Sequence, residues 1–132
     1  MRRERTPIFF DGGCRPNPGA METAVVLRGE PHRRTNLGHG DNNEAEWLAL
    51  LHAVALAVAA GLRDVLFVGD SALVIAQARG NQRCRDSRLR SHLDAFRLAV
   101  AAIPRHGFKQ VPRSRNLAGI ALARASLVGD GR

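Results

Sequence analysis

The stretch NEAEWLALLHAVALAVAAGLRDVLFV, residues 43–68, joins a long apolar helix to a buried strand. Apolar residues recur with a helical period over residues 43–60, with many alanines between them, which predicts a helix that is buried over most of its surface. Gly61 is expected to end this helix. Residues 65–68 form a continuous apolar run, which is typical of a central strand covered on both faces. The stretch therefore predicts a sheet with helices packed against it.

Three short strands are expected before this helix. Residues 8–10 are an apolar run that is expected to end in a turn at Asp11-Gly12-Gly13. Residues 24–27 are expected to form the second strand, and the polar residues 32–37 a third strand at the edge of the sheet. The two prolines of residues 15–19 lack an N–H donor, so that segment is predicted to be a loop. We expect the three strands to form an antiparallel meander.

The remaining segments are a helix from an Asp70-Ser71 cap through about Arg79, a helix over residues 89–103, a strand over residues 108–111 and a helix over residues 116–127. The predicted order is thus βββ-α-β-α-α-β-α. Because strand–helix–strand connections favour parallel pairing, the fold class is expected to be α/β. It is a mixed five-stranded sheet, with three antiparallel strands followed by parallel core strands and with helices on both faces.

Composition limits the class of protein. The 132 residues suit one domain over residues 1–132, and a hydrophobic content of 45% is enough to form a core. No charge-free apolar stretch reaches the ~20 residues of a membrane span, and the N-terminal residues do not resemble a secretory signal peptide. Cys14 and Cys84 are therefore expected to be free thiols in a reducing compartment. We expect a cytoplasmic monomer.

The charge is strongly basic. Lys and Arg number 20 against 12 Asp and Glu, which gives a net charge of +8, and Lys109 is the single lysine. Arginine binds phosphate through two parallel hydrogen bonds, so the surplus favours a nucleic-acid partner. Arginines in residues 79–90, with Arg113 and Arg115, are candidates for phosphate contacts. From charge alone, arginine-rich coding that merely keeps the protein soluble explains the surplus equally well.

Three acids occupy positions that favour a metal site. Asp11 follows the first strand, Glu46 lies in the first turns of the long helix, and Asp70 follows the central strand. Ligands of parallel sheets bind beyond the carboxyl ends of the strands, and clustered carboxylates suit Mg²⁺ or Mn²⁺. Taken singly, Asp11 could be a turn residue, Glu46 an exposed charge and Asp70 a helix cap. Together they favour metal-assisted phosphodiester chemistry.

The sequence around these acids resembles the type 1 ribonuclease H family. Residues 11–19 (DGGCRPNPG) match the family's Asp-Gly-(four residues)-Asn-Pro-Gly motif, residues 42–46 (NNEAE) match Asn-Asn-(two residues)-Glu, and Asp70-Ser71 matches Asp-Ser. Residues 108–116 are similar to the family's last strand and the turn after it. The resemblance spans residues 8–123. It implies a ribonuclease H-like fold and an endonuclease that cuts the RNA strand of RNA–DNA hybrids with two divalent ions, leaving a 3′-hydroxyl and a 5′-phosphate.

The resemblance also assigns roles to individual residues. It implies that Asp11 bridges the two ions, Mg²⁺ or Mn²⁺, and that Glu46 and Asp70 complete their ligands. Small residues allow the protein to approach a shallow minor groove, where 2′-hydroxyls distinguish RNA from DNA, and asparagine can both donate and accept hydrogen bonds there. The family's hybrid-contacting positions are Gly12, Gly13, Cys14, Asn17, Asn42, Asn43, Ser71 and Arg113.

Four features depart from the family pattern. Ile120 stands where the family has its fourth acid, and isoleucine cannot bind a metal ion. Asp41 replaces a threonine that helps to hold a DNA phosphate, so a carboxylate there repels phosphate unless it turns inward as a helix cap. Ala72 replaces a glutamine. The connection over residues 80–89 is too short for the extra basic helix of longer members, so the chain resembles a compact form.

The change at Ile120, natural or engineered, leaves the function open between two classes. The first is an endonuclease with reduced or Mn²⁺-dependent activity. The second is a module on the same fold that binds hybrid or double-stranded nucleic acid and no longer cuts. A third possibility, another nuclease or resolvase of the wider superfamily, is disfavoured because such proteins share the acids without the Asn-Pro-Gly and Asn-Asn motifs.

Overall fold

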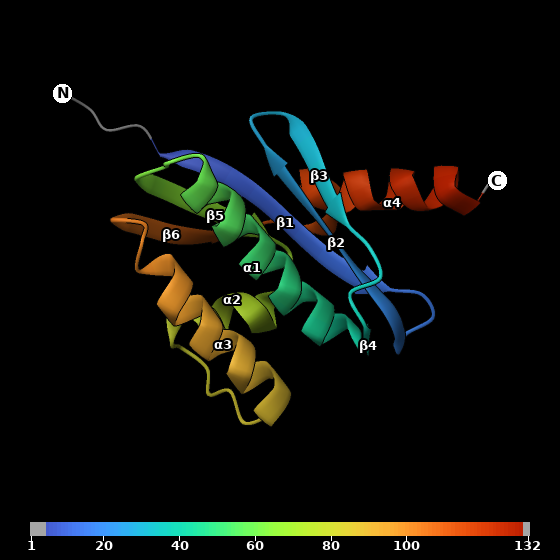
Figure 1. Ribbon diagram of the computed structural model, residues 1–132, viewed down its shortest axis with the longest axis horizontal. Helices are drawn as coiled ribbons and strands as arrows, with labels where there is room; N and C mark the ends of the chain where they lie inside the picture. Colours follow the sequence, from blue (N-terminus) through green and yellow to red (C-terminus); the bar gives the residue numbers. More distant parts are fainter. Residues whose placement is uncertain (1–4, 131–132) are drawn as a thin grey trace.

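The computed structural model describes residues 5–130, which form a sheet with helices on both faces (Figure 1). Its elements in chain order are β1 (Thr6–Cys14), β2 (Gly19–Leu27), β3 (Glu30–Arg34), β4 (His39–Gly40), α1 (Asn42–Ala59), β5 (Asp64–Gly69), α2 (Ala72–Arg79), α3 (Ser87–Val100), β6 (Arg105–Gln110), the short 3₁₀ helix η1 (Arg113–Arg115) and α4 (Leu117–Asp130). Within this part of the chain, no helix has the length and apolar character that a membrane crossing requires.

The sheet has the mixed topology predicted from the sequence. Its strand order is β3-β2-β1-β5-β6. β1 pairs antiparallel with β2, and β2 with β3, whereas β5 runs parallel to both β1 and β6. The two-residue strand β4, which the sequence did not predict, pairs with the start of β2. The α/β fold class and the five long strands are therefore confirmed.

The first strand does not stop at Asp11, as the sequence analysis expected. β1 continues to Cys14 because β2 pairs with it over the whole length, with Asp11 opposite Ala24 and Gly13 opposite Glu22. Gly12 serves close packing rather than a turn, since a Cβ there would lie 2.0 Å from the Ala45 carbonyl oxygen of α1. Asp11 is thus a strand residue whose side-chain direction is set by the sheet.

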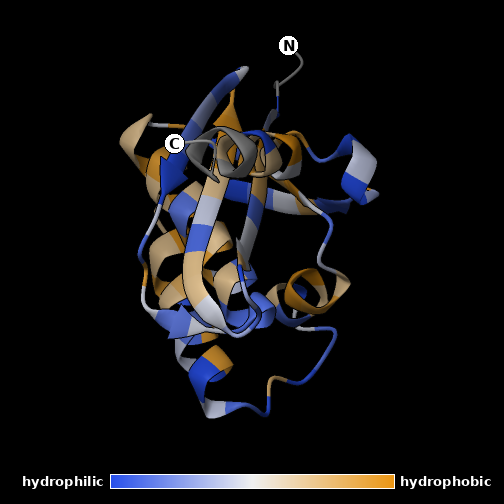
Figure 2. Ribbon diagram, turned by 90° about the vertical axis from the view of Figure 1, so that its right-hand side faces the viewer, coloured by the Kyte–Doolittle hydropathy of each residue, from blue (hydrophilic) through white to orange (hydrophobic). Residues whose placement is uncertain are grey.

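Two apolar layers enclose the sheet. α1, α2 and α3 cover one face in a core that contains Trp47, Phe67 and Phe96, and the Trp47 indole Nε1 donates to Gln77 Oε1 at 2.9 Å. α4 covers the other face, where Ala118 and Leu122 belong to a separate apolar cluster. The loop between α2 and α3 is mostly hydrophilic (Figure 2). The layers place the carboxyl end of β5 beside the start of α1 and the start of α4.

Candidate metal and nucleic-acid site

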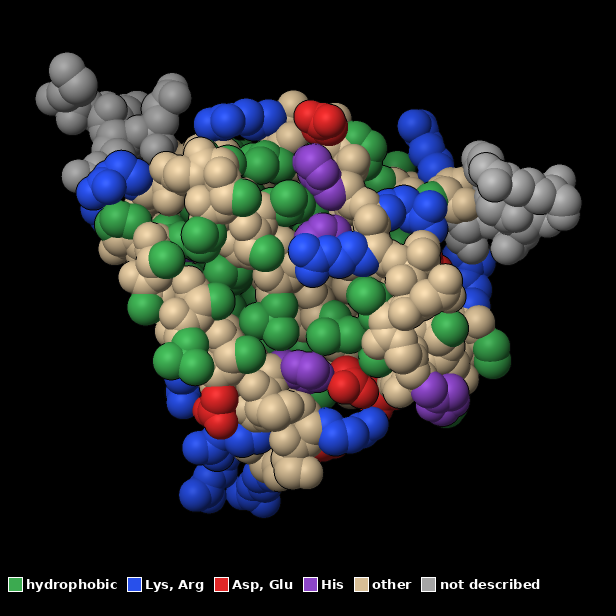
Figure 3. Space-filling model, in the orientation of Figure 1, with side chains coloured by type: hydrophobic (Ala, Val, Ile, Leu, Met, Phe, Trp, Pro, Cys, Tyr) green, Lys and Arg blue, Asp and Glu red, His purple; other side chains and the backbone are tan. Residues whose placement is uncertain are grey.

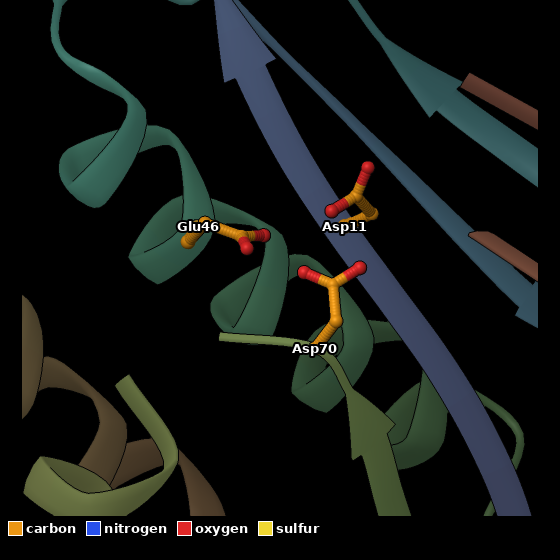
Figure 4. Close-up of side chains that lie close together, drawn as sticks. All are labelled: Asp11, Glu46 and Asp70. Carbon is orange, nitrogen blue, oxygen red and sulfur yellow. The ribbon is translucent and has the colours of Figure 1, made fainter. Parts of the chain in front are cut away.

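Asp11, Glu46 and Asp70 meet at the carboxyl end of β5 (Figure 4). Pairing between β1 and β5 runs from Thr6 opposite Val65 to Phe9 opposite Val68 and ends there. Asp11 from β1 and Asp70 after β5 lie just beyond this point, and Glu46 reaches them from α1. Each offers one carboxylate oxygen, and the three oxygens lie within 4.8 Å of one another. The structure thus brings together the three acids that the sequence analysis singled out.

Backbone and amide groups hold these carboxylates in place. The Gly12 amide N–H donates to Glu46 Oε1 at 2.7 Å. Asn116, which is fully buried, donates from Nδ2 to Asp70 Oδ2 at 3.2 Å and to the Phe10 carbonyl at 3.0 Å. Sequence reasoning used Asn116 only as part of a motif and missed this role. The available signal was an asparagine at the first position of the predicted terminal helix, where this residue type commonly acts as a cap.

Burial and mutual repulsion raise the pKa values of Asp11 and Glu46. Burial, followed by the Asp70 charge, raises the pKa of Asp11 to about 6, while its hydrogen bond with Glu46 and the Arg113 charge act in the opposite direction. Burial and the Asp11 charge raise the pKa of Glu46 well above its usual value. A bound divalent cation would relieve both effects. Clustered carboxylate oxygens without nitrogen or sulfur ligands fit Mg²⁺ or Mn²⁺.

The residues around Asp11 and Glu46 form one pocket. Of the predicted hybrid-contacting positions, its lining includes Gly12, Gly13, Cys14, Asn42, Asn43, Ser71 and Arg113. Asn17 lies beside it and accepts a hydrogen bond from the Asn42 backbone N–H at 3.2 Å. Asp70 and Arg113 line an adjoining pocket. The first pocket also has lining residues that the motifs do not indicate, which are Arg15, Glu22, Gly119, Leu122 and Ala123.

The terminal helix approaches Asp11 through Gly119 rather than through Ile120. A Cβ added at Gly119 would lie 3.4 Å from Asp11 Oδ2. Ile120 is 39% exposed and is absent from the residues that line the pocket. The structure therefore does not bring Ile120, the predicted position of the missing acid, into the carboxylate cluster. The position was found by counting residues from Asn116, and such a count does not show which side of α4 faces the pocket.

Asp41 is turned inward as a helix cap. Its Oδ1 accepts from the Glu44 backbone N–H at 2.9 Å, and its Oδ2 lies 3.4 Å from Arg88 on α3. Asp41 is thus the residue that caps the N-terminus of α1. The Arg88 charge also reduces the repulsion that a phosphate would meet here.

A mixed sheet with this strand order and an acidic cluster at the end of β5 defines a ribonuclease H-like fold and site. A family model described as "Reverse transcriptase-like" matches residues 9–126. Ribonuclease HI of Halobacterium salinarum is 31% identical over 96% of this chain and 66% of its own length. The crystal structure of RNase H1 from that archaeon has a TM-score of 0.86 and covers 96% of this chain and 99% of its own.

Two further solved structures are similar. The N-terminal RNase H domain of Rv2228c from Mycobacterium tuberculosis is 25% identical with a TM-score of 0.78, over 90% of this chain and 95% of its own. LC11-RNase H1, solved in complex with an RNA/DNA hybrid, is 28% identical with a TM-score of 0.76, over 86% of this chain and 89% of its own. The chain belongs to the type 1 ribonuclease H family, a family of endoribonucleases. It spans about a third, 32%, of the length of the bifunctional protein Rv2228c.

Proposed function

We propose that this protein is an endonuclease that hydrolyses the RNA strand of RNA–DNA hybrids with the help of divalent ions, Mg²⁺ or Mn²⁺. The observation that carries the proposal is the convergence of Asp11, Glu46 and Asp70 within 4.8 Å. Family membership supports it, as does the LC11 relative solved with an RNA/DNA hybrid. We further propose two ions, and a monomer that acts in the cytoplasm.

The residues divide the work between the ions and the substrate. Asp11, Glu46 and Asp70 would hold the ions, which when bound polarise the scissile phosphate and lower the pKa of the attacking water. Gly13, where a Cβ would meet only Asn42 Oδ1 at 3.8 Å, leaves bare backbone for close approach of the minor groove. The Asn42 side chain would be held in place to contact the hybrid, because its oxygen accepts a hydrogen bond from the Cys14 backbone N–H at 3.2 Å.

Arg113 and a separate group of arginines would hold the phosphate backbone. Arg113 lies between the two pockets, next to both Asp11 and Asp70. The group of arginines gathers at the lower end of the molecule, over the α2–α3 loop and the start of α3 (Figure 3). It consists of the exposed residues Arg83, Arg85, Arg88 and Arg90. Such contacts are independent of sequence and weaken with salt.

A hybrid-binding module without cutting activity is the second candidate. The observation that favours it lies in α4, which carries no carboxylate between residues 117 and 125 and presents Gly119, Leu122 and Ala123 to the pocket. Proteins of this kind would bind hybrid through the same glycines and asparagines while leaving the RNA strand intact.

Cleavage of a labelled RNA–DNA hybrid in Mg²⁺, and separately in Mn²⁺, distinguishes the two candidates. We expect cutting by the wild type that is stronger in Mn²⁺, and none by Asp70→Asn. That variant keeps the shape of the side chain and an oxygen that can accept from Asn116, so its fold and its hybrid affinity should be retained. Binding without cutting in either ion would refute the endonuclease and favour the module. Full activity of Asp70→Asn would exclude the assigned metal site.

A further inference from the structure

Glu22 is a pocket carboxylate that lies outside the cluster of Asp11, Glu46 and Asp70. It lines the same pocket as Asp11 and Glu46, and its side chain is 21% exposed. Its Oε1 accepts a hydrogen bond from the Arg33 guanidinium of β3 at 2.9 Å. Neither the sequence motifs nor the proposed function uses this residue.

The register of the sheet directs Glu22 to the same face as Asp11. Side chains of directly opposed residues project from one face of a sheet, as do those of residues i and i+2. Asp11 is opposite Ala24, and Gly13 is opposite Glu22, so Asp11 and Glu22 both project toward the face that α4 covers. Gly13 lies between them without a side chain. Bare backbone therefore separates the two carboxylates.

Among the described side chains, the rest of that side of the pocket carries no negative charge. α4 contributes Gly119, Leu122 and Ala123 to the lining, and none of these residues has a side chain that can bind a cation. Within residues 5–125, the carboxylates that line this pocket are those of Asp11, Glu46 and Glu22. A second divalent ion beside Asp11 needs further oxygen ligands. Glu22 is the remaining carboxylate of this lining that can provide one, directly or through a bound water.

We propose that Glu22 supplies the additional carboxylate for the second divalent ion, in place of an acid from α4, and that Arg33 competes with the ion for it. This inference rests on the proposed function, because it concerns the ions of the same site. A guanidinium at 2.9 Å occupies an oxygen that an ion would use. Ion binding must therefore weaken the pair between Glu22 and Arg33.

If Arg33 competes with the ion for Glu22, substitutions of these two residues have opposite effects on the affinity for Mn²⁺. Both Glu22→Gln and Arg33→Gln break the pair, so a purely structural pair predicts that both variants behave alike once the general effect of the changed net charge is subtracted. If Glu22 is a ligand, Glu22→Gln weakens binding of the second Mn²⁺ on the order of tenfold. Arg33→Gln frees the carboxylate and strengthens binding several-fold. In the double variant, Arg33→Gln no longer raises the affinity for Mn²⁺, because the Glu22 carboxylate that it would free is absent.

The measurement is Mn²⁺ binding followed by loss of the free Mn²⁺ signal in electron paramagnetic resonance. It uses the full chain with an uncleavable hybrid whose RNA strand is 2′-fluoro-substituted. The matched controls are Glu30→Gln and Arg34→Gln, which make the same charge changes at exposed residues of β3 away from the pocket. Their effects on Mn²⁺ affinity should be small and are subtracted.

Three results would overturn the proposal. They are a single Mn²⁺ bound by the wild type, equal Mn²⁺ affinity in Glu22→Gln and Glu30→Gln, and changes of the same sign in Glu22→Gln and Arg33→Gln. None of these results would remove cutting that depends on Asp70. Failure of the Glu22 assignment is therefore distinguishable from failure of the proposed function, which the Asp70→Asn cleavage assay tests.

Discussion

Asn116 joins Asp70 to the first strand, because its Nδ2 lies 3.2 Å from Asp70 Oδ2 and 3.0 Å from the Phe10 carbonyl oxygen. The start of α4 is thereby connected to both strands that carry the site. Asn116 Oδ1 accepts a hydrogen bond from the Ala118 backbone N–H at 3.1 Å, which fixes the orientation of the Asn116 side-chain amide. One buried side chain thus positions a candidate metal ligand and begins the terminal helix.

Asn116→Ala should therefore lower both stability and activity. The Phe10 carbonyl would lose a buried donor, which costs about 1–3 kcal/mol of the free energy of unfolding. Asp70 would lose the group that orients it, so hybrid cleavage should fall more than the folded fraction does. Urea unfolding and cleavage of a labelled hybrid measure the two effects. Asn81→Ala, at an exposed loop position, is the control, and equal stability of the two variants would contradict the prediction.

Gly12 and Gly13 should respond differently to alanine. A Cβ at Gly12 would lie 2.0 Å from the Ala45 carbonyl oxygen, whereas one at Gly13 would meet only Asn42 Oδ1 at 3.8 Å. We expect Gly12→Ala to push α1 away from the sheet and to lower the free energy of unfolding by about 3 kcal/mol, the upper end of the usual cost of overpacking. Gly13→Ala should keep its stability and weaken hybrid binding. Thermal unfolding and hybrid titration measure these outcomes, and a stable Gly12→Ala protein would disprove the assigned packing.

An acid introduced at Gly119 should couple to divalent ions more strongly than one at Ile120. A Cβ added at Gly119 would lie 3.4 Å from Asp11 Oδ2, whereas Ile120 is 39% exposed. Without ions, Gly119→Asp should lower the melting temperature by charge repulsion. Added Mn²⁺ should then raise it by more than in the wild type, because the ion binds the folded state. A larger Mn²⁺-dependent rise in Ile120→Asp would show that α4 is rotated differently.

His52 should make the protein less stable in mild acid. Burial, followed by the charges of Arg34 and His32, lowers the pKa of His52 to about 4, and the ring Nδ1 lies 2.9 Å from Thr23 Oγ1. The unfolded chain takes up this proton near pH 6.5, before the folded protein does. Stability is therefore full above about pH 6.5 and is lost as the pH falls toward about 4, by about 2–3 kcal/mol.

Urea unfolding of the wild type and of His52→Asn, at about pH 7 and about pH 4.5, isolates this contribution. Asparagine keeps a polar atom near Thr23 and does not titrate. The loss of unfolding free energy between the two pH values should be smaller in the variant than in the wild type. Equal losses would show that His52 does not carry the acid sensitivity.

Local patterns in the sequence were sufficient for the fold class and for the three acids. The order of strands and helices follows from hydrophobic period and from breakers such as Gly61, which act over a few residues. Asp11, Glu46 and Asp70 each stand in a short motif at the end of a predicted element or in its first turns. Parallel-sheet topology then brings such positions to one edge, so their convergence was predictable without coordinates.

The tertiary structure alone decided how far β1 extends and which further side chains meet the pocket. Asp11 lies within a strand because β2 supplies partners beyond it, and Glu22 faces the pocket because of that same register. Gly119 rather than Ile120 faces Asp11 because packing of Ala118 and Leu122 against the sheet sets the rotation of α4. Register and helix rotation depend on contacts between residues far apart in the chain, and no local pattern encodes them.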